Sequence, residues 1–432
     1  MTNMHHVTET DWNSVKMQAR LKARYRRERR FRFFGFAAVM LAAAFLFTLI
    51  GTIGSSGIRG MFQTYIKIEV TFPKGLFQGQ DRDDAIDRAN YQIMIRNALR
   101  AEYPAVTSRQ DRRRLNRIIS PGARAMLRDY VAENPTVIGT KQFVWLLASD
   151  DIDQLQKGMI DPRRPERDRR VKDSELKWVE QLEKKDAIDI KFHSRFFTGG
   201  DSRDPENVGI WGAIVGTSLT LLVTLAVAFP IGVLSAVYLE EFAPKNRFTD
   251  FIEVNINNLA AVPSIIFGLL GLAVFLGLFN MPRSIPLVGG LTLALMTLPT
   301  IIIAARAAIK AVPPSVRDAA HGLGASKSQV VFHHVLPLAM PGILTGTILG
   351  MAQALGETAP LLMIGMVAFV VDIPSSVTDA ATALPVQVFI WANSPERLFI
   401  EKTSAAILVL LTFLVCMNSV AIWLRNKFEK QL

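Results

Sequence analysis

Six apolar runs, each long enough to cross a membrane, constrain what this chain of 432 residues can fold into. A helix needs about 20 apolar residues to cross a hydrocarbon core about 30 Å thick. The runs lie near residues 33–53, 210–239, 254–279, 287–309, 341–371 and 404–424. They predict an α-helical membrane protein with six transmembrane helices. The second and fifth runs exceed the required length, which indicates tilted helices or helices that extend past the membrane.

A polar segment of mixed pattern, residues 54–207, separates the first run from the second. Apolar residues alternate with polar ones from Ile66 to Phe72 and again from Ile188 to Phe192, as in half-buried strands. These two strands lie near membrane helices, so we expect them to pair and close the domain at its base. Helical patterns lie around residues 82–102, 109–119, 123–133, 141–147 and 174–185. The segment is therefore predicted to be an α/β insertion between the first two transmembrane helices.

Basic residues in the tails and short loops predict the orientation in the membrane. Segments that would face the cytoplasm with the amino terminus inside carry 18 Lys and Arg, against three in the outer loops. This predicts a basic cytoplasmic tail at 1–32, a cytoplasmic tail at 425–432 and an extracytoplasmic insertion at 54–207. The expected location is the bacterial inner membrane, with five helices of a permease domain at 208–424.

Three segments of the sequence have more than one interpretation. The first run, preceded by arginines and followed by Gly54 and Ser55, is either a signal peptide or a membrane helix, and its length favours the helix. The basic tail before it fits anionic lipid better than nucleic acid, since it flanks a span. The charged run at 163–170 is either a solvated linker or a docking patch for an acidic partner.

The sequence carries no motif for enzyme chemistry. It has no GxxxxGK[ST] for a phosphate-binding loop, and neither HExxH nor GxSxG. The pairs His5-His6 and His333-His334 lie in a tail and on adjacent helical positions, which is poor geometry for a metal. The single Cys416 excludes an internal disulfide and lies in an apolar run. We therefore expect no catalytic residue, no cofactor and no metal.

A polar loop at 312–337 lies between the fourth and fifth runs. Ser315 followed by Asp318 predicts the capped start of a short helix that ends at Gly322 and Gly324. A second capping box at Ser326 precedes Pro337, which is expected to close the unit. Small residues leave the turn bare enough for another protein to approach, although an ordinary inter-helix loop has the same local pattern.

Polar side chains within the apolar runs are the other candidates for function. Glu357, followed by Thr358, lies in the fifth run, where a buried acid costs roughly 2.5–3.5 kcal/mol on insertion scales. Asn255, Asn257 and Asn258 open the third run and either face the pathway or bond to neighbouring helices. The fifth run contains no Lys or Arg, so a charged partner for Glu357 must come from elsewhere.

The loop at 312–337 resembles the EAA loop with which permease subunits of ABC importers dock onto their ATPase subunits. The residues that carry the spacing are Asp318, Ala319, Ala320, Gly324, Leu336 and Pro337. Asp318 replaces the usual Glu and His334 the usual Ile. Three further motifs, YLEEFAPKN at 238–246, NINNLA with VPSI at 255–265, and LGETAPL at 355–361, resemble the PstA family of the bacterial phosphate ABC importer. The resemblance covers about residues 205–425.

This resemblance implies the core of a type I ABC importer permease and a role as its transmembrane half. It implies a PstC-like permease beside the chain, two PstB-like ATPases and a PstS-like periplasmic phosphate-binding protein. Candidates for the translocation pathway are then Gln353, Glu357, Thr358, Asn255 and Asn258, with Gln353 standing where relatives commonly have Arg. A permease for another oxyanion, such as molybdate or phosphonate, and a membrane sensor that uses residues 54–207 remain as alternatives.

Overall fold

The computed structural model describes residues 15–79, 81–367 and 369–429. His5, His6 and the outer ends of the predicted tails lie outside the described residues. The chain divides into two units, Met1–Ser55 and Ser56–Leu432. The first unit holds most of α1 (Val15–Gly60), the helix that carries the first apolar run. Within the described residues five helices are long and apolar enough to span a membrane, or six if one bent pair is a single span.

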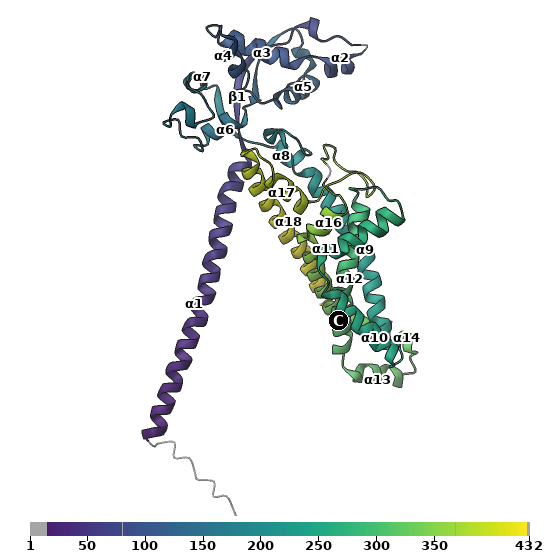
Figure 1. Cartoon of the computed structure of the whole chain (residues 1–432). Helices are drawn as coiled ribbons and strands as arrows, with labels where there is room; N and C mark the ends of the chain where they lie inside the picture. Colours follow the sequence, from purple (N-terminus) through teal and green to yellow (C-terminus); the bar gives the residue numbers. More distant parts are fainter. Residues whose placement is uncertain (1–14, 80, 368, 430–432) are drawn as a thin grey trace, which may run out of the picture. The chain divides into compact units, whose positions relative to one another are not determined.

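The insertion is built on a three-stranded antiparallel sheet with the order β2-β1-β3 (Figure 1). Its strands are β1 (Phe62–Thr71), β2 (Lys141–Leu147) and β3 (Ile188–Phe192). The pairing expected of the first and last strands is present, with Phe62 opposite Phe192 and Ile66 opposite Ile188. The alternating residues Ile66, Ile68 and Val70 are 0–2% exposed and face a core shared with the helices.

Short helices cover the sheet and complete the core of the insertion. They are α2 (Arg82–Arg88), α3 (Tyr91–Glu102), α4 (Arg109–Leu115), α5 (Ala123–Glu133), α6 (Asp150–Gln156) and α7 (Asp173–Lys184), whereas α8 (Arg195–Thr198) packs through Phe196 against the permease domain. Side-chain oxygens of Asp81 and Asn90 accept from the first turns of α2 and α3, which explains why the single helix expected at 82–102 is two.

The helix expected at residues 141–147 is wrong, because this segment is strand β2. Val144 and Leu146 face the core and alternate with the more exposed Phe143 and Trp145. Seven residues are too few to separate a helical from an alternating pattern. The aromatic and β-branched side chains at 143–145 fit a strand that pairs with β1.

The permease domain consists of helices, bent segments and loops after Asn207. Its helices are α9 (Trp211–Val237), α10 (Arg247–Ala260), α11 (Ser264–Gly271), α12 (Pro286–Ala311), α13 (Pro314–Gly322), α14 (Lys327–Val330), α15 (Leu336–Gly356), α16 (Ala359–Met363), α17 (Leu384–Ala392) and α18 (Leu398–Glu429). π-helical segments extend α9 through Phe242 and α11 through Leu278, and another, Val331–Val335, leads into α15.

Helices α9 and α12 form the centre of this domain and approach closely at glycines. A methyl group on Gly290 of α12 would lie 2.5 Å from Cβ of Val223 on α9. Thr224 of α9 donates a hydrogen bond to the Gly290 carbonyl at 3.2 Å. Small residues at such a crossing let two helix backbones approach and exchange polar contacts, which is how helices associate within a membrane.

Two of the expected spans are wrong in their extent. The third run is not one straight helix, since α10 and the helix that begins at Ser264 are bent by 102°. Pro263 lacks an amide hydrogen and restricts the preceding residue, which weakens a helix at this point, and α10 ends at Ala260. In the fifth run α15 ends at Gly356, and the chain continues as the short α16 and then without a helix until Leu384.

The insertion contacts the start of α18 through a buried group of charged side chains. Nζ of Lys157, on the turn that ends α6, lies 2.6 Å from Asp153 and 3.0 Å from Glu401 of α18. Lys402 is fully buried and donates to the carbonyl of Gly60 at 2.8 Å. A methyl group on Gly60 would lie 2.4 Å from the Glu401 carbonyl oxygen, so only glycine permits this approach.

His193, after β3, is buried beside the same group of charges. Burial, together with Lys402, Arg195 and Lys157, lowers the pKa of His193 to about 3, so its ring is neutral near pH 7. Its Nδ1 lies 2.9 Å from the Tyr65 hydroxyl. The base of the insertion is therefore a set of charged and polar groups held in fixed positions.

Candidate functional site

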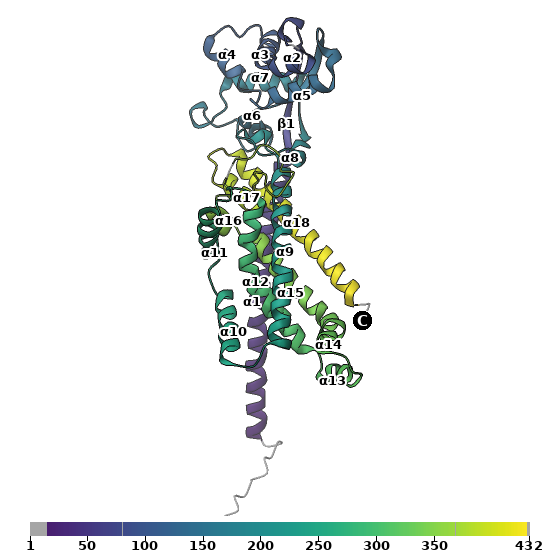
Figure 2. The same ribbon diagram turned by 90° about the vertical axis from the view of Figure 1, so that its right-hand side faces the viewer.

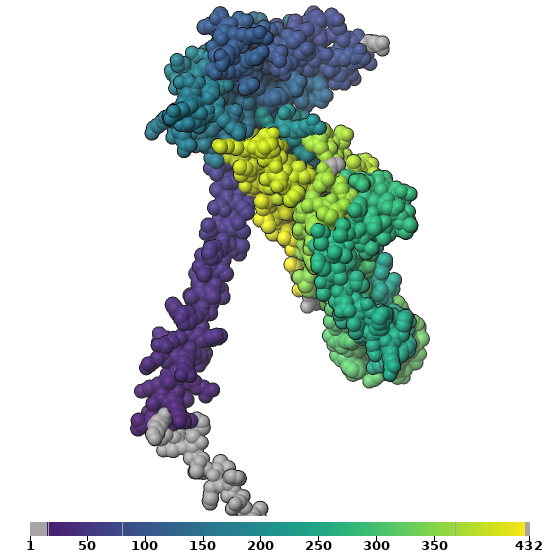
Figure 3. Space-filling view, in the orientation of Figure 1, coloured from purple at the N-terminus to yellow at the C-terminus, as the bar shows by residue number. Residues whose placement is uncertain are grey.

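The loop predicted to dock forms a tip at the end of the permease domain away from the insertion (Figures 1 and 2). Figure 3 shows this tip, in light green, at the molecular surface. Pro313 precedes α13 and Pro314 occupies its first turn, so the capped start expected at Ser315 is wrong by two residues. The end of α13 at Gly322 and the capping box of Ser326 with Gln329 are as expected. Pro337 lies in the first turn of α15 rather than closing the unit.

The loop residues predicted to act together lie on different faces. Ala320 is 5% exposed and packs with Val330, Val331 and Val335 under the tip. Asp318, Ala319 and Gly324 are exposed, whereas Leu336 and Pro337 are partly buried. The segment therefore combines a packed underside with a bare outer face.

Leu323 is the residue at this tip that the sequence analysis missed. Its side chain is 91% exposed, and Gly324 beside it has a φ of +83° with no atom within 4 Å of an added Cβ. Glycine turns the chain there at no steric cost. A leucine between two glycines in an otherwise polar loop was the available signal. The turn therefore leaves this apolar side chain open to contact from another protein.

A network of ion pairs joins the tip to the membrane helices. Nη2 of Arg317 on α13 lies 2.7 Å from Glu241 at the end of α9, and Arg317 also donates to the carbonyls of Ile309 and Val312. Arg306 of α12, 8% exposed, lies 2.5 Å from Glu240 and 2.6 Å from Glu253 of α10. Charged contacts that are partly or largely shielded from water thus connect α13 to the end of α9, and connect α12 to the end of α9 and to α10.

The predicted pathway residues are not gathered at one point. Asn255 and Asn258 are exposed on α10, and Asn255 donates to the Phe251 carbonyl on its own helix. Glu357 and Thr358 are partly exposed in the break between α15 and α16, one turn after the exposed Gln353. In the part of the chain that the structure describes, no hydrogen bond or ion pair joins the asparagines to Glu357. Glu357 and Thr358 lie at the break between α15 and α16, and Asn258 lies two residues before the end of α10.

Comparisons with known proteins find matches for both the insertion and the permease domain. Residues 228–431 match the family described as binding-protein-dependent transport system inner membrane component, and residues 18–166 match a domain of unknown function, DUF3333. The phosphate transport system permease protein PstA of Mycobacterium leprae is 30% identical over 213 residues, which are 49% of this chain and 68% of that protein. The probable ABC transporter permease protein YqgI of Bacillus subtilis is 34% identical over 168 residues, 39% of this chain and 57% of that protein.

Among solved structures, the inward-facing MetNI methionine ABC transporter matches 51% of this chain and 97% of its own chain, with a TM-score of 0.42 and 16% identity. The transport-family match and the apolar helices define the class of protein, a permease subunit of a type I ABC importer. The chain belongs to the PstA family of these permeases. In such permeases the ATPase activity lies in separate subunits, so this chain is not itself an enzyme.

Proposed function

We propose that this chain forms one transmembrane half of an ATP-driven importer of inorganic phosphate. The family to which it belongs and the names of its relatives support phosphate as the substrate. The exposed tip at Leu323, tied to the end of α9 by the ion pair of Arg317 with Glu241, is the observation that carries the coupling role. A PstC-like permease supplies the other half, two PstB-like ATPases dock at the tips, and a PstS-like protein delivers phosphate from the periplasm.

Transport then follows from movement of the tip. Closure of the ATPases on ATP draws α13 with it, and Arg317 carries the displacement to Glu241 and hence to α9. The helix breaks after Ala260 and Gly356 give the domain places to bend. The two permease halves open alternately to the two sides of the membrane, and phosphate passes between them near Glu357 and Thr358.

Uptake of labelled phosphate by vesicles that contain all four kinds of subunit tests this function. We expect ATP-dependent uptake that excess molybdate or phosphonate does not suppress. Uptake of molybdate or phosphonate in preference to phosphate would assign the chain to another oxyanion. Vesicles without this subunit are the control and are expected to take up none.

The docking role of the tip is tested by co-purification of the ATPase. Leu323→Asp and Gly324→Trp are expected to abolish it, because one removes the apolar contact and the other adds bulk at the turn. Gly324→Asn is the matched control, since asparagine tolerates the positive φ of this position. Normal ATPase recovery with both disruptive variants would count against the tip as the docking site.

We also propose that both termini are cytoplasmic and that the insertion is periplasmic. The 18-to-3 charge asymmetry supports this orientation, and so does the position of the tip at the far end of the permease domain from the insertion. Labelling tests it after Cys416, the native cysteine, is changed to serine. A cysteine at the exposed Lys177 should react with an impermeant thiol reagent outside spheroplasts, and one at the exposed Ser328 should not. Reversed labelling would overturn the orientation.

A further inference from the structure

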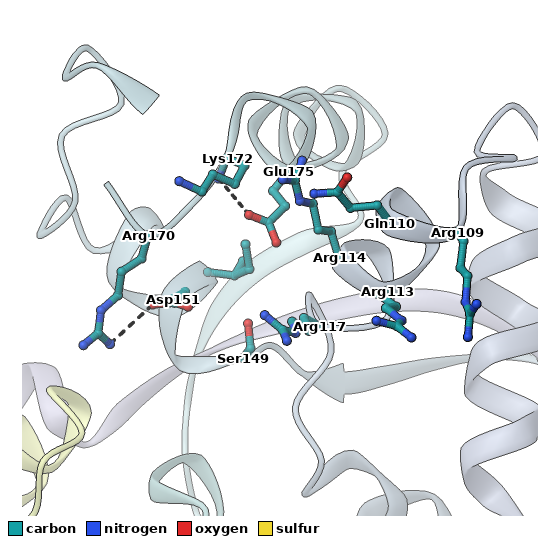
Figure 4. Close-up of a pocket in the computed structure, with 11 residues that line it drawn as sticks. Arg109, Gln110, Arg113, Arg114, Arg117, Ser149, Asp151, Arg170, Lys172 and Glu175 are labelled. Atoms are coloured by element: carbon teal, nitrogen blue, oxygen red, sulfur yellow. Dashed lines mark hydrogen bonds and ion pairs between the residues drawn. The ribbon is translucent and has the colours of Figure 1, made fainter. Parts of the chain in front are cut away.

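A strongly basic cavity of about 670 Å³ lies in the insertion, remote in sequence from the loop and pathway residues (Figure 4). Its walls come from α4, the start of α6 and the segment that leads into α7. Six cationic side chains line it: Arg109, Arg113, Arg114, Arg117, Arg170 and Lys172. Only two acidic side chains, Asp151 and Glu175, line it with them. The walls therefore carry an excess of positive charge.

The arginines form a row. Arg109 and Arg113 are one turn apart on the same face of α4, and Arg117 follows in the turn after that helix. At a rise of 1.5 Å per residue these three positions extend over roughly 12 Å. Figure 4 shows Arg109 at one end of the cavity and Arg170 at the other, with Arg113 and Arg117 between them.

Most of this positive charge is not neutralised within the fold. Arg109, Arg113 and Arg117 are exposed and, within the described residues, form no ion pair with a carboxylate. Asp151 lies 3.8 Å from Arg170, a long contact at the edge of the cavity. Glu175 accepts a hydrogen bond from the backbone of Lys172 at 2.7 Å and caps α7, so its carboxylate has a structural partner. Like charges this close repel one another unless an anion joins them.

We propose that this cavity binds a small oxyanion of the phosphate type that carries several negative charges, such as a short phosphate chain. Guanidinium groups present paired N–H donors that match phosphate oxygens, and a row of them matches a row of phosphates. Orthophosphate has a single centre and reaches only part of the row. The site is separate from the transport pathway, and the proposal does not rest on the proposed function.

Binding to the purified full-length protein in nanodiscs of neutral lipid tests the proposal, with tripolyphosphate, pyrophosphate, orthophosphate and sulfate as probes. Calorimetric titration should show tripolyphosphate binding most tightly and losing affinity as salt is added. Equal affinity for orthophosphate would overturn the requirement for several charges. Nanodiscs with anionic lipid separate a soluble anion from a lipid headgroup: competition between that lipid and tripolyphosphate would assign the site to lipid phosphate and overturn a soluble ligand.

Substitutions in the wall of the cavity test whether tripolyphosphate binds there. Arg113→Ala with Arg117→Ala should weaken tripolyphosphate binding at least tenfold, whereas Arg163→Ala with Arg164→Ala, exposed and outside the cavity lining, should leave it unchanged. Asp151→Asn should instead tighten binding, because it removes negative charge from the wall. Loss of binding in the Arg163 and Arg164 control to the same extent, or no gain with Asp151→Asn, would overturn the site. The proposal would also be overturned if tripolyphosphate did not bind and a purified acidic partner protein bound through Arg113 and Arg117.

Discussion

Lys157, directly after α6, and Glu401 of α18, 244 residues apart in the chain, form an ion pair of 3.0 Å at the junction between the insertion and the permease domain. Their side chains are 4% and 7% exposed, and Asp153 shares the ammonium group at 2.6 Å. Charges so shielded from water depend on one another, because each would be costly to bury alone. The last membrane helix and the insertion are therefore joined at a point that does not tolerate loss of one partner.

Lys157→Met is expected to destabilise the protein by about 3–5 kcal/mol, the usual cost of leaving a buried charge unpaired. The variant removes the ammonium group that Asp153 and Glu401 share. Thermal unfolding of the purified full-length protein measures the loss. Lys157→Arg keeps the charge and should retain most of the stability, and addition of Glu401→Gln to Lys157→Met should recover part of it. An unchanged midpoint for Lys157→Met would show that the pair does not hold the junction.

Glu206, buried just before α9, makes stability depend on pH. Burial raises the pKa of its carboxyl to about 7, with Asp204 and Asp150 adding to the rise and hydrogen bonds from its own backbone and Ser120 opposing it. A folded pKa above the unfolded value means that the folded protein holds the proton more tightly. This stabilisation is complete below pH ~4.5 and is lost as the pH rises through about 7, up to roughly 3 kcal/mol.

We therefore expect the difference in unfolding temperature between the parent protein and Glu206→Gln to change between pH 5 and pH 8, with the parent losing stability relative to the variant as the pH rises. Asp150, whose pKa burial raises to about 6, changes stability in the same direction as Glu206, whereas His193, whose pKa is lowered, changes it in the opposite direction, and both effects are common to the two proteins. Glu180→Gln, at an exposed position of α7, is the control and should keep the full slope. A Glu206→Gln protein with the same pH profile as the parent would contradict the assignment.

Arg317→Ala should uncouple transport without releasing the ATPase. Arg317 joins α13 to Glu241 at 2.7 Å, whereas the outer face of the tip around Leu323 does not depend on this pair. We expect ATPase co-purification near normal and phosphate uptake reduced by about tenfold or more, since a lost hydrogen bond to a charged group costs roughly 1.5–3 kcal/mol.

Lys310→Ala provides the comparison for this prediction. Lys310 lies 3.3 Å from Glu240, but its side chain is 63% exposed, so its ion pair contributes little. Uptake should stay within about twofold of normal. Equal losses of phosphate uptake in Arg317→Ala and Lys310→Ala would mean that the ion pairs act only through surface charge.

Glu357→Gln distinguishes a transport role from a structural one. The substitution keeps shape and hydrogen-bonding capacity but removes the charge at the break between α15 and α16. We expect the complex to assemble in normal amount and to import phosphate more slowly, with the charge meeting a cation of the second permease. Normal uptake would exclude a charged partner, and failure to assemble would make Glu357 structural.

The sequence predicts those elements whose pattern lies within one segment. Alternation from Ile66 predicts β1, and the pattern at residues 123–133 predicts α5 with the bounds that it has. The segment at 141–147 was mistaken for a helix because seven residues fit both periods, and only its partner β1 decides between them. Proline at 263 was visible in the sequence, but the 102° bend that follows from it depends on packing.

The motif of the candidate site can be predicted from the sequence, but the ion pairs around it cannot. The spacing from Asp318 to Pro337 marks the tip from sequence alone. The ion pairs of Glu240 with Arg306 and of Glu241 with Arg317 join residues 66 and 76 positions apart. Nothing in the sequence specifies which of the many carboxylates an arginine meets, because that depends on how α9, α12 and α13 pack.

The backbone amide of His193 donates to the carbonyl of Met61 at 2.9 Å, so the points where the chain enters and leaves the sheet are neighbours. Backbones paired in this way lie about 5 Å apart, a gap that two residues bridge. Removal of everything between these points would leave the path of the chain through the membrane nearly unaltered. The insertion is thus connected to the rest of the chain through two neighbouring backbone segments, and its removal would also take Lys157 and Asp153 away from Glu401.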